Sequence, residues 1–297
     1  MIIRKVRKAL WLIKYFGFNA LLSIFTHELR EPIIIKCNGD EVEATPYMLR
    51  WLLHAMDLGY VKKVHCGDGE FVIINKYDDE VRIKYNNDGY VINGYRFKSL
   101  NRPLAAVFLG EEYWGVNARN KIIVYVGAFI GDSAIYFVLK GAGGVIAIEP
   151  HPGAYAEILD NIRLNNMESV IIPINAGLAS KPGKICIGNI GVEDTAVTYH
   201  RPGDCPSTIK AVTLGELING FGIDGDRAVL KMDCEGCEFD VILNDYEHVR
   251  LFRELIFEYH SYVVNKPVDD ILRVLDRDYK CEVRGDKNGG IIQCIRK

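Results

Sequence analysis

The feature that most constrains this chain is an alternation of short apolar runs with helical segments from residue 121 onward. The first run, "KIIVYV", is continuously apolar, which is typical of a parallel strand buried on both faces. "DSAIYFVLK" then predicts a helix, with Asp132 or Ser133 as its cap, and "GVIAIE" predicts a second strand. The pattern continues through "PGAYAEILDNIRLNN", "SVIIPIN", "RAVLKMD", "CEFDVILND" and "RELIFEYH". We therefore predict an α/β fold with a doubly wound, Rossmann-like sheet.

The last segment, "YKCEVRGDKNGGIIQCIRK", has two β-type runs around "DKNGG", which indicates a hairpin. A dinucleotide-binding sheet is normally parallel throughout. A final antiparallel strand hairpinned to its neighbour is instead the usual ending of S-adenosylmethionine-dependent methyltransferases. The topology thus favours methyl transfer over hydride transfer.

The first third of the chain has a different pattern. "TPYMLRWLLHAMDLGY" has helical spacing and stops at Gly59, while "EFVIIN", "VRIKYN" and "YVINGYRF" are short β-type runs separated by turn residues. We predict a small α+β domain over residues 1–105, with a helical segment and a β-meander. The second domain then covers residues 106–297, with the boundary near "LNRPLA".

The composition limits which classes of partner and which cellular compartment we expect for this protein. The 297 residues include 36 basic and 39 acidic side chains, a net charge of −3, so we expect no nucleic-acid partner. The cysteines lack the dense, regular spacing of a disulfide scaffold, which predicts small buried hydrophobes in a reducing cytoplasm. They are Cys37, Cys66, Cys186, Cys205, Cys234, Cys237, Cys281 and Cys294.

Residues 1–30 combine basic side chains with apolar runs. Lys14 and Asn19 interrupt the apolar stretch, which argues against both a signal peptide and a transmembrane helix. Two interpretations stay open for this segment. It is a basic amphipathic helix that gives the protein a peripheral membrane contact, or it is a helix docked on its own protein.

The turn "VGAFIGDS" places Gly127 and Gly131 where a strand crosses to a helix and a ligand can approach the backbone closely. The spacing is G-x-x-x-G, so the G-x-G-x-x-G pyrophosphate fingerprint is absent. Glu149 ends the second strand, where an acidic side chain accepts hydrogen bonds from the two ribose hydroxyls of an adenosine-containing cofactor.

Three separated motifs carry a family resemblance: "VGAFIGDSAIYFVLKGAGGVIAIEPHPGAYAEILDNIRLNN", "VLKMDCEGCEFDVIL" and "LIFEYH". In this order they resemble the FkbM-like family of S-adenosylmethionine-dependent methyltransferases, particularly archaeal members, over roughly residues 111–262. The resemblance implies S-adenosylmethionine as cofactor. It also implies three sets of cofactor-binding residues: Gly127, Ala128, Gly131 and Asp132 at the methionine end, Glu149 at the ribose, and Asn175 with Ala176 beside the adenine.

One position departs from the family. Tyr125 stands where the family usually has an acidic residue that supports the glycine loop and helps to hold the cofactor's ammonium group. Tyrosine cannot supply that negative charge, which leaves three alternatives. Cofactor affinity is reduced, another carboxylate such as Asp233 compensates, or the protein is a catalytically degenerate member that binds at a membrane surface.

Methyl transfer to a hydroxyl needs a base as well as alignment. Asp233, Glu235 and His260 follow the fourth and fifth predicted strands, and an ordinary histidine pKa near 6.5 suits proton removal. No metal site is fixed by spacing, and none is expected. We therefore expect O-methylation of a small-molecule or glycan hydroxyl, with a nucleotide-dependent oxidoreductase as a further alternative. The loop "VEDTAVTYHRPGD" offers candidate acceptor contacts at Thr195, Tyr199, His200 and Arg201.

Overall fold

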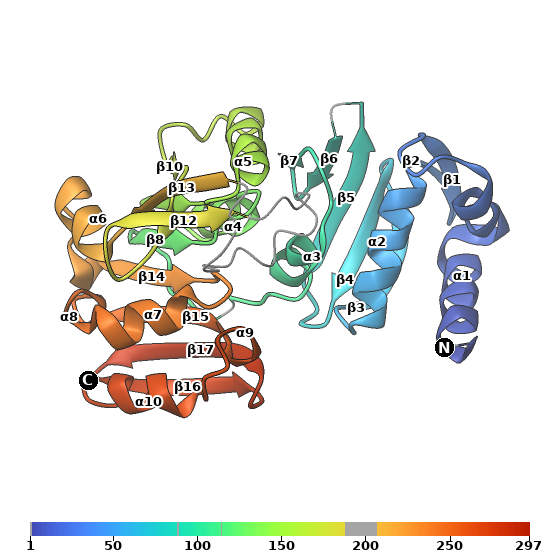
Figure 1. Cartoon of the computed structure of the whole chain (residues 1–297). Coiled ribbons are helices and arrows are strands. Elements are labelled where there is room, and N and C mark those ends of the chain that lie inside the picture. Colours follow the sequence, from blue (N-terminus) through green and yellow to red (C-terminus); the bar gives the residue numbers. More distant parts are fainter. Residues whose placement is uncertain (1, 88, 114, 188–206) are drawn as a thin grey trace. The chain divides into compact units, whose positions relative to one another are not determined.

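The computed structural model describes residues 2–87, 89–113, 115–187 and 207–297 (Figure 1). The chain divides into two compact units, Met1–Trp114 and Gly115–Lys297. The first unit thus runs beyond residue 105, through one more helix.

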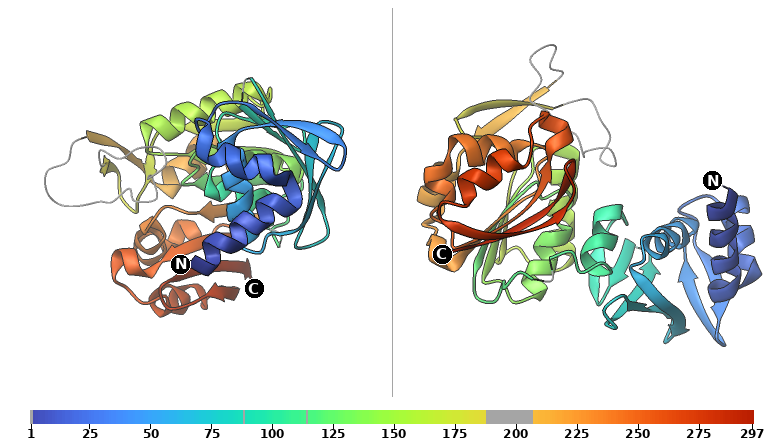
Figure 2. Two further views of the ribbon diagram at one scale, coloured as in Figure 1. Left: turned by 90° about the vertical axis from the view of Figure 1, so that its right-hand side faces the viewer. Right: turned by 90° about the horizontal axis from the view of Figure 1, so that it is seen from below.

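The first unit is an α+β unit whose outermost helix is α1 (Figures 1 and 2). Helix α1 packs against α2 and β1, and strands β3 to β7 form a five-stranded antiparallel sheet in chain order, as the meander pattern predicts. The elements are α1 (Ile2–Thr26), β1 (Ile33–Cys37), β2 (Asp40–Ala44), α2 (Pro46–Asp57), β3 (Val61–Gly67), β4 (Glu70–Asn75), β5 (Glu80–Asn86), β6 (Gly89–Ile92), β7 (Tyr95–Phe97) and α3 (Arg102–Phe108).

The second unit is built on a seven-stranded sheet of order β10-β9-β8-β14-β15-β17-β16. The first five of these strands pair in parallel, whereas β17 runs antiparallel to β15 and to β16. The predicted Rossmann-like methyltransferase sheet with a C-terminal antiparallel hairpin is therefore confirmed. The strands are β8 (Ile122–Val126), β9 (Gly144–Ile148), β10 (Ile171–Ile174), β14 (Ala228–Met232), β15 (Glu254–His260), β16 (Tyr279–Gly285) and β17 (Gly289–Arg296).

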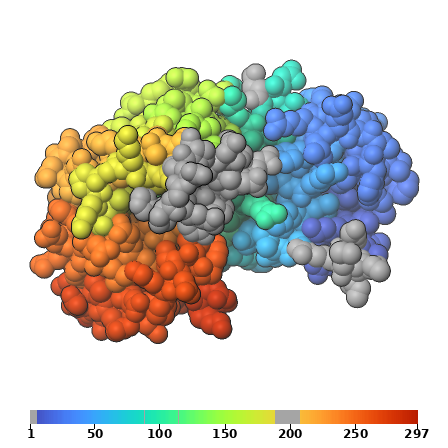
Figure 3. All heavy atoms as spheres, viewed as in Figure 1, coloured from blue at the N-terminus to red at the C-terminus, as the bar shows by residue number. Residues whose placement is uncertain are grey.

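Helices and a small accessory sheet complete this unit. The accessory sheet has the order β11-β13-β12. Figure 3 draws the heavy atoms of the whole chain as spheres, with the C-terminal hairpin of this unit in red. The remaining elements are α4 (Asp132–Leu139), α5 (Pro152–Leu164), β11 (Gly177–Leu178), β12 (Gly183–Ile187), β13 (Ser207–Val212), α6 (Leu214–Phe221), η2 (Gly225–Arg227), α7 (Cys237–Asn244), α8 (Tyr246–Val249), α9 (Ser261–Val264) and α10 (Asp269–Leu275).

Local sequence explains why the site-bearing elements begin where they do. The central strands are almost wholly buried, as their continuous apolar runs predict. Helix α4 begins after its N-cap, Gly131, which has a φ of 83° and provides no side-chain cap. The expectation that Asp132 or Ser133 caps this helix is therefore wrong, because a left-handed backbone at that point favours glycine.

The cysteines that the structure describes are paired, contrary to the prediction of free thiols, while Cys205 lies outside the described residues. Disulfides join Cys37 to Cys66, Cys234 to Cys237 and Cys281 to Cys294, and Cys186 is also disulfide-bonded. Cys281 and Cys294 face each other directly in the β16–β17 register. Strand register brings these two together across a hairpin, so spacing along the chain was the wrong signal. The prediction of a reducing compartment rested on unpaired cysteines, so these disulfides remove its basis.

Candidate cofactor and acceptor site

The glycine loop follows β8 and crosses close to the end of β14. Gly127 has a φ of 75°, and a Cβ added there would lie 1.7 Å from the backbone oxygen of Asp233. The Asp233 N–H in turn donates to the oxygen of Val126 at 2.9 Å. Only glycine fits at residue 127, and the fit holds the loop directly beside Asp233.

The backbone N–H groups of this loop are largely used within the protein. Those of Gly127 and Ala128 both donate to the oxygen of Ile148, at 2.9 and 3.0 Å, and that of Gly131 donates to Ala128 at 2.7 Å. These bonds fix the loop to the end of β9. Ligand binding by the loop therefore relies on close approach and on side chains.

Glu149, directly after β9, points at the glycine loop. Its Oε2 accepts the N–H of Phe129 and its Oε1 accepts the N–H of His151, each at 2.7 Å, and the residue is 5% exposed. Burial raises the pKa of Glu149 to about 7, against the lowering effect of the two backbone hydrogen bonds. A carboxylate has about four acceptor positions, so acceptor capacity remains for two hydroxyl donors.

Tyr125 lies on β8 two residues before Gly127, and Lys231 lies beside it on β14. The two residues are register neighbours on β8 and β14, and the Nζ of Lys231 lies 3.9 Å from the Tyr125 ring centroid. Lys231 is fully buried and pairs with Asp233 at 3.2 Å. Tyr125 is hydrogen-bonded to Ser133, and burial, with the charges of Asp132 and Asp233, holds its pKa well above the ordinary value. The tyrosine is thus a neutral part of the sheet.

Asp132 supplies negative charge that Tyr125 cannot. Its Oδ1 accepts the N–H of Ser133 at 2.7 Å, whereas its buried Oδ2 accepts no hydrogen bond from the described residues. Burial raises the pKa of Asp132 to about 6. A buried carboxylate oxygen of this kind is costly unless a ligand completes it.

The two residues predicted beside the adenine lie at the end of β10. The Asn175 side chain donates to the backbone oxygens of Glu149 and Pro150, at 2.8 and 3.3 Å, so it holds the segment that carries Glu149. Ala176 is buried in the core cluster of the sheet. Neither contact requires a ligand.

Asp233, Glu235 and His260 come together at the carboxyl ends of β14 and β15. The Nε2 of His260 lies 3.5 Å from Oε1 of Glu235, and one ligating atom from each of the three residues falls within 4.8 Å of the others. Oε2 of Glu235 is buried and has no hydrogen-bond partner among the described residues. Glu235 also has a φ of 53°, a strained backbone for a non-glycine residue.

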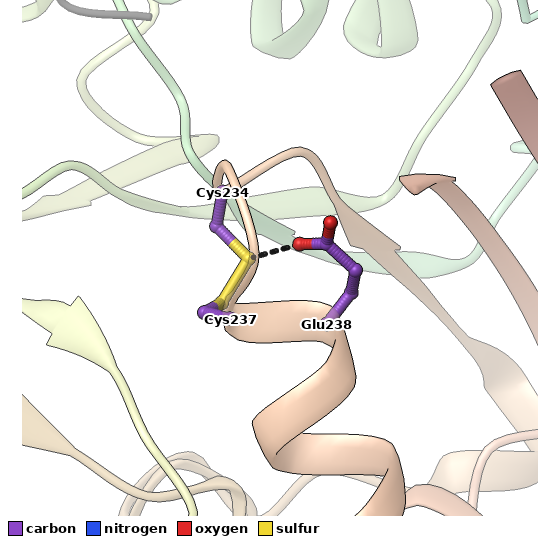
Figure 4. A group of neighbouring side chains, drawn as sticks. All are labelled: Cys234, Cys237 and Glu238. Carbon is purple, nitrogen blue, oxygen red and sulfur yellow. Dashed lines mark hydrogen bonds between the residues drawn. A yellow bond between two sulfur atoms is a disulfide. The ribbon is translucent and has the colours of Figure 1, made fainter. Parts of the chain in front are cut away.

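Glu238, in the first turn of α7, fixes this cluster from below. Glu238 is fully buried. Its Oε1 accepts hydrogen bonds from the backbone N–H and from the ring Nδ1 of His260, each at 2.9 Å. Its Oε2 accepts a hydrogen bond from the backbone N–H of Gly236 at 3.0 Å. Sγ of Cys234 lies 3.3 Å from Oε2, the dashed contact in Figure 4. The Cys234–Cys237 disulfide closes the same turn, so these cysteines offer no thiolate to a metal.

The pKa values in this cluster differ from the ordinary ones. Burial lowers the pKa of His260, but the hydrogen bond and charge of Glu238, with the charges of Glu235 and Asp233, raise it overall to about 9. Burial raises the pKa of Glu235 to about 7, while the charge of His260 opposes that shift. The expectation of a histidine pKa near 6.5 is therefore wrong, because carboxylates surround the ring.

The side chains around the loop suit a cationic nucleoside better than a pyrophosphate. Asp132, Asp233 and Glu149 all raise the pKa of Tyr125 by their charge, so three carboxylates converge on this place. Carboxylates attract an ammonium or sulfonium group and accept hydroxyl protons, whereas they repel phosphates. The residues present therefore fit S-adenosylmethionine.

Two residues that hold the candidate site together were not predicted from the sequence. Lys231 is a charged residue inside an otherwise apolar strand run, and Glu238 follows the second cysteine of "CEGCE"; both were visible but have no spacing that marks them. The loop candidates Thr195, Tyr199, His200 and Arg201 lie outside the described residues.

Comparison with known proteins adds a family. Among curated protein sequences none matches the chain. Three solved structures are similar to it: a fibrillarin/Nop5p complex (15% identity, 79% of this chain and 97% of that chain, TM-score 0.42), M. capricolum TrmK with S-adenosyl-homocysteine (13%, 67% and 69%, 0.41), and the ribosomal protein L11 methylase of Lactobacillus delbrueckii subsp. bulgaricus (12%, 63% and 76%, 0.39).

The family model for the FkbM methyltransferase domain matches residues 126–281, which is more than half of the chain and spans the glycine loop, Glu149, Asp233, Glu235 and His260. The protein therefore belongs to the FkbM family of methyltransferases, and its cofactor is S-adenosylmethionine.

Proposed function

We propose that this methyltransferase acts on a hydroxyl group of a small molecule or glycan. The observation that carries the proposal is the Glu235 carboxylate, which has one buried oxygen without a hydrogen-bond partner among the described residues and lies with Asp233 and His260 at the carboxyl ends of β14 and β15. A hydroxyl must lose its proton during methylation, and a buried carboxylate with a free oxygen is suited to accept it.

Glu235 is the better base of the cluster. The pKa of Glu235 is raised to about 7 and that of His260 to about 9, so near neutrality the carboxylate can take up a proton while the imidazole already holds one. His260, oriented by Glu238, keeps Glu235 in place and balances its charge. Asp233 is held by Lys231 between this cluster and the glycine loop.

The cofactor site lies on the other side of Asp233. When bound, S-adenosylmethionine supplies an electrophilic methyl group on a sulfonium. Glu149 would hold the sugar hydroxyls, and Asp132 would face the cationic methionine end. Gly127 permits the approach because it carries no side chain. These residues bind and orient, whereas Glu235 moves the proton.

The test is methyl transfer from isotopically labelled S-adenosylmethionine to matched acceptor panels. One panel contains sugars, polyols and phenols, and the control panel contains amines, carboxylates and RNA. We expect label in hydroxyl acceptors as an alkali-stable ether. Label confined to the control panel would contradict O-methylation and leave the family assignment intact.

The variant Glu235→Gln sharpens this test. It keeps the size of the side chain and removes the base, so we expect the transfer rate to fall by about 100-fold while cofactor affinity changes little. The exposed Glu247→Gln on α8 is the matched control, with an unchanged rate. An unaltered rate in Glu235→Gln would exclude Glu235 as the base.

A further inference from the structure

Helix α1 presents an apolar face outward as well as inward. Its inward side chains, Leu12, Phe16 and Ala20, are buried against the rest of the first unit. A helix on a protein surface normally turns polar residues to water. In α1, however, exposed apolar side chains line the solvent side both before and after Gly17. In each half of the helix three such residues follow one another at spacings of four and then three positions. We call this set the outer stripe: Val6, Leu10, Ile13, Phe18, Leu22 and Phe25, which are 41–79% exposed.

Charged residues are also distributed unevenly between this segment and the rest of the chain. Residues 1–27 contain five basic side chains and no acidic one, while the remainder of the chain has 31 basic and 39 acidic side chains. Arg7 and Lys8 pair with the buried Asp57 on α2, whereas Lys14 makes no ion pair with a described residue and its Nζ lies 4.8 Å from the Tyr15 ring centroid. The helix therefore carries positive charge beside an exposed apolar stripe on a protein that is otherwise acidic.

The length of the helix allows two relations to a bilayer, and the structure favours one. Val6–Thr26 is long and apolar enough to cross a membrane, by length and composition alone, and 22% of that stretch is buried in the protein. Gly17, with φ 79° and ψ 170°, interrupts the helix, so each half is shorter than the roughly 20 residues that a span requires. The buried side chains also tie both halves to the unit. A helix held in this way lies along a surface.

We propose that the outer stripe of α1 docks on an anionic lipid surface, with the apolar side chains in the headgroup boundary and the basic side chains on the lipid phosphates. Apolar burial and attraction to anionic lipids together drive such binding. A second copy of the chain is the competing occupant. It fits less well, because pairing two outer stripes would bring two basic segments together without compensation. The proposal is independent of the acceptor chemistry.

The test is flotation of the full chain with phosphatidylcholine vesicles, with and without phosphatidylglycerol. We expect binding to the vesicles that contain phosphatidylglycerol and weaker binding at high salt. The triple variant Leu10→Ser/Phe18→Ser/Phe25→Ser should lose at least about tenfold in binding, because three exposed apolar side chains are removed. Lys14→Glu should reduce binding to the anionic vesicles alone.

The control changes three exposed apolar residues outside α1, Leu58→Ser/Ile172→Ser/Leu251→Ser, which are 44–46% exposed, and should bind as the wild type does. Thermal unfolding checks that each variant is folded. Three results would overturn the proposal: no binding to either vesicle, equal binding by the outer-stripe variant, or protein that resists alkaline extraction as a spanning helix would. A dimer that dissociates in the outer-stripe variant, without vesicle binding, would assign the stripe to a second copy.

Discussion

Glu149 and Glu235 each follow the carboxyl end of a parallel strand, and burial raises the pKa of both to about 7, yet their surroundings differ. Both oxygens of Glu149 accept a backbone N–H at 2.7 Å. Glu235 has one oxygen 3.5 Å from His260 and a second, buried oxygen without a partner among the described residues. The two carboxylates thus have similar pKa values, although the hydrogen bonds of Glu149 hold both of its oxygens and one oxygen of Glu235 lacks a partner among the described residues.

These surroundings suit the two carboxylates to different roles. A carboxylate held by two backbone N–H groups keeps its place and can still accept hydroxyl protons, which suits binding. A carboxylate with a free oxygen beside a charged imidazole can exchange a proton with a substrate, which suits catalysis. The following predictions separate the binding side from the catalytic side.

Gly127→Ala should have the largest effect, and it acts on the binding side. The added Cβ would lie 1.7 Å from the Asp233 oxygen at a φ of 75°, so the loop must move. We expect cofactor affinity to fall by at least about 100-fold and the free energy of unfolding to fall by about 3 kcal/mol. Titration calorimetry and chemical unfolding measure the two changes.

The control for this variant is Gly220→Ala in α6, where an added Cβ meets nothing within 4 Å. This control should bind cofactor normally and be stabilised by roughly 0.5–1 kcal/mol, since alanine is a better helix former than glycine. Normal cofactor binding by Gly127→Ala would show that the loop does not form the site.

The titration of His260 probes the catalytic side. Its raised pKa means that the ring is charged at neutral pH and loses its proton near pH 9, which NMR of the imidazole can follow. Glu235→Gln removes one of the charges that raise this pKa, so the midpoint should fall by about one unit. A wild-type midpoint near 6.5 would contradict the carboxylate-surrounded geometry.

The pH dependence of the methyl-transfer rate should reflect the protonation of Glu235 and His260. Because the base form of Glu235 is the deprotonated one, the rate should rise as the pH increases through about 7. It should then decline as His260 loses its charge near pH 9. The two groups interact, so the measured midpoints belong to the pair. A profile that is flat between pH 6 and about 8 would exclude this assignment of the base.

Asn175→Ala should have the smallest effect. The variant removes hydrogen bonds to the backbone that carries Glu149, which should lower the free energy of unfolding by about 1 kcal/mol and cofactor affinity by about fivefold. Asn244→Ala on α7, whose side chain bonds to Asp240 at the surface, is the control and should leave affinity unchanged. Equal affinities would show that Asn175 does not position Glu149.

The fold could be predicted from the sequence because its signals are local. Continuous apolar runs such as "KIIVYV" and the "DKNGG" turn identify parallel strands and a hairpin without any knowledge of distant contacts. The places of Gly127 in a turn and of Glu149 after a strand could be predicted for the same reason, since neighbouring residues mark a sharp turn and a strand end.

What could not be predicted depends on distant parts of the chain. The disulfide between Cys281 and Cys294 follows from strand register, and the raised pKa of His260 follows from Glu238, which lies 22 residues away on another element. Lys231 has a typical surface residue type, but pairing with Asp233 and contact with the Tyr125 ring make its burial tolerable.

Calorimetric titration of S-adenosylhomocysteine into the wild type, Glu149→Gln and Glu235→Gln measures whether the carboxylate at the end of β9 holds the cofactor. Glu149→Gln should weaken binding by at least about tenfold, since it removes a carboxylate acceptor, while Glu235→Gln should stay within about threefold of the wild type. Equal affinity of Glu149→Gln and the wild type, with both proteins folded, would contradict a cofactor held at the end of β9.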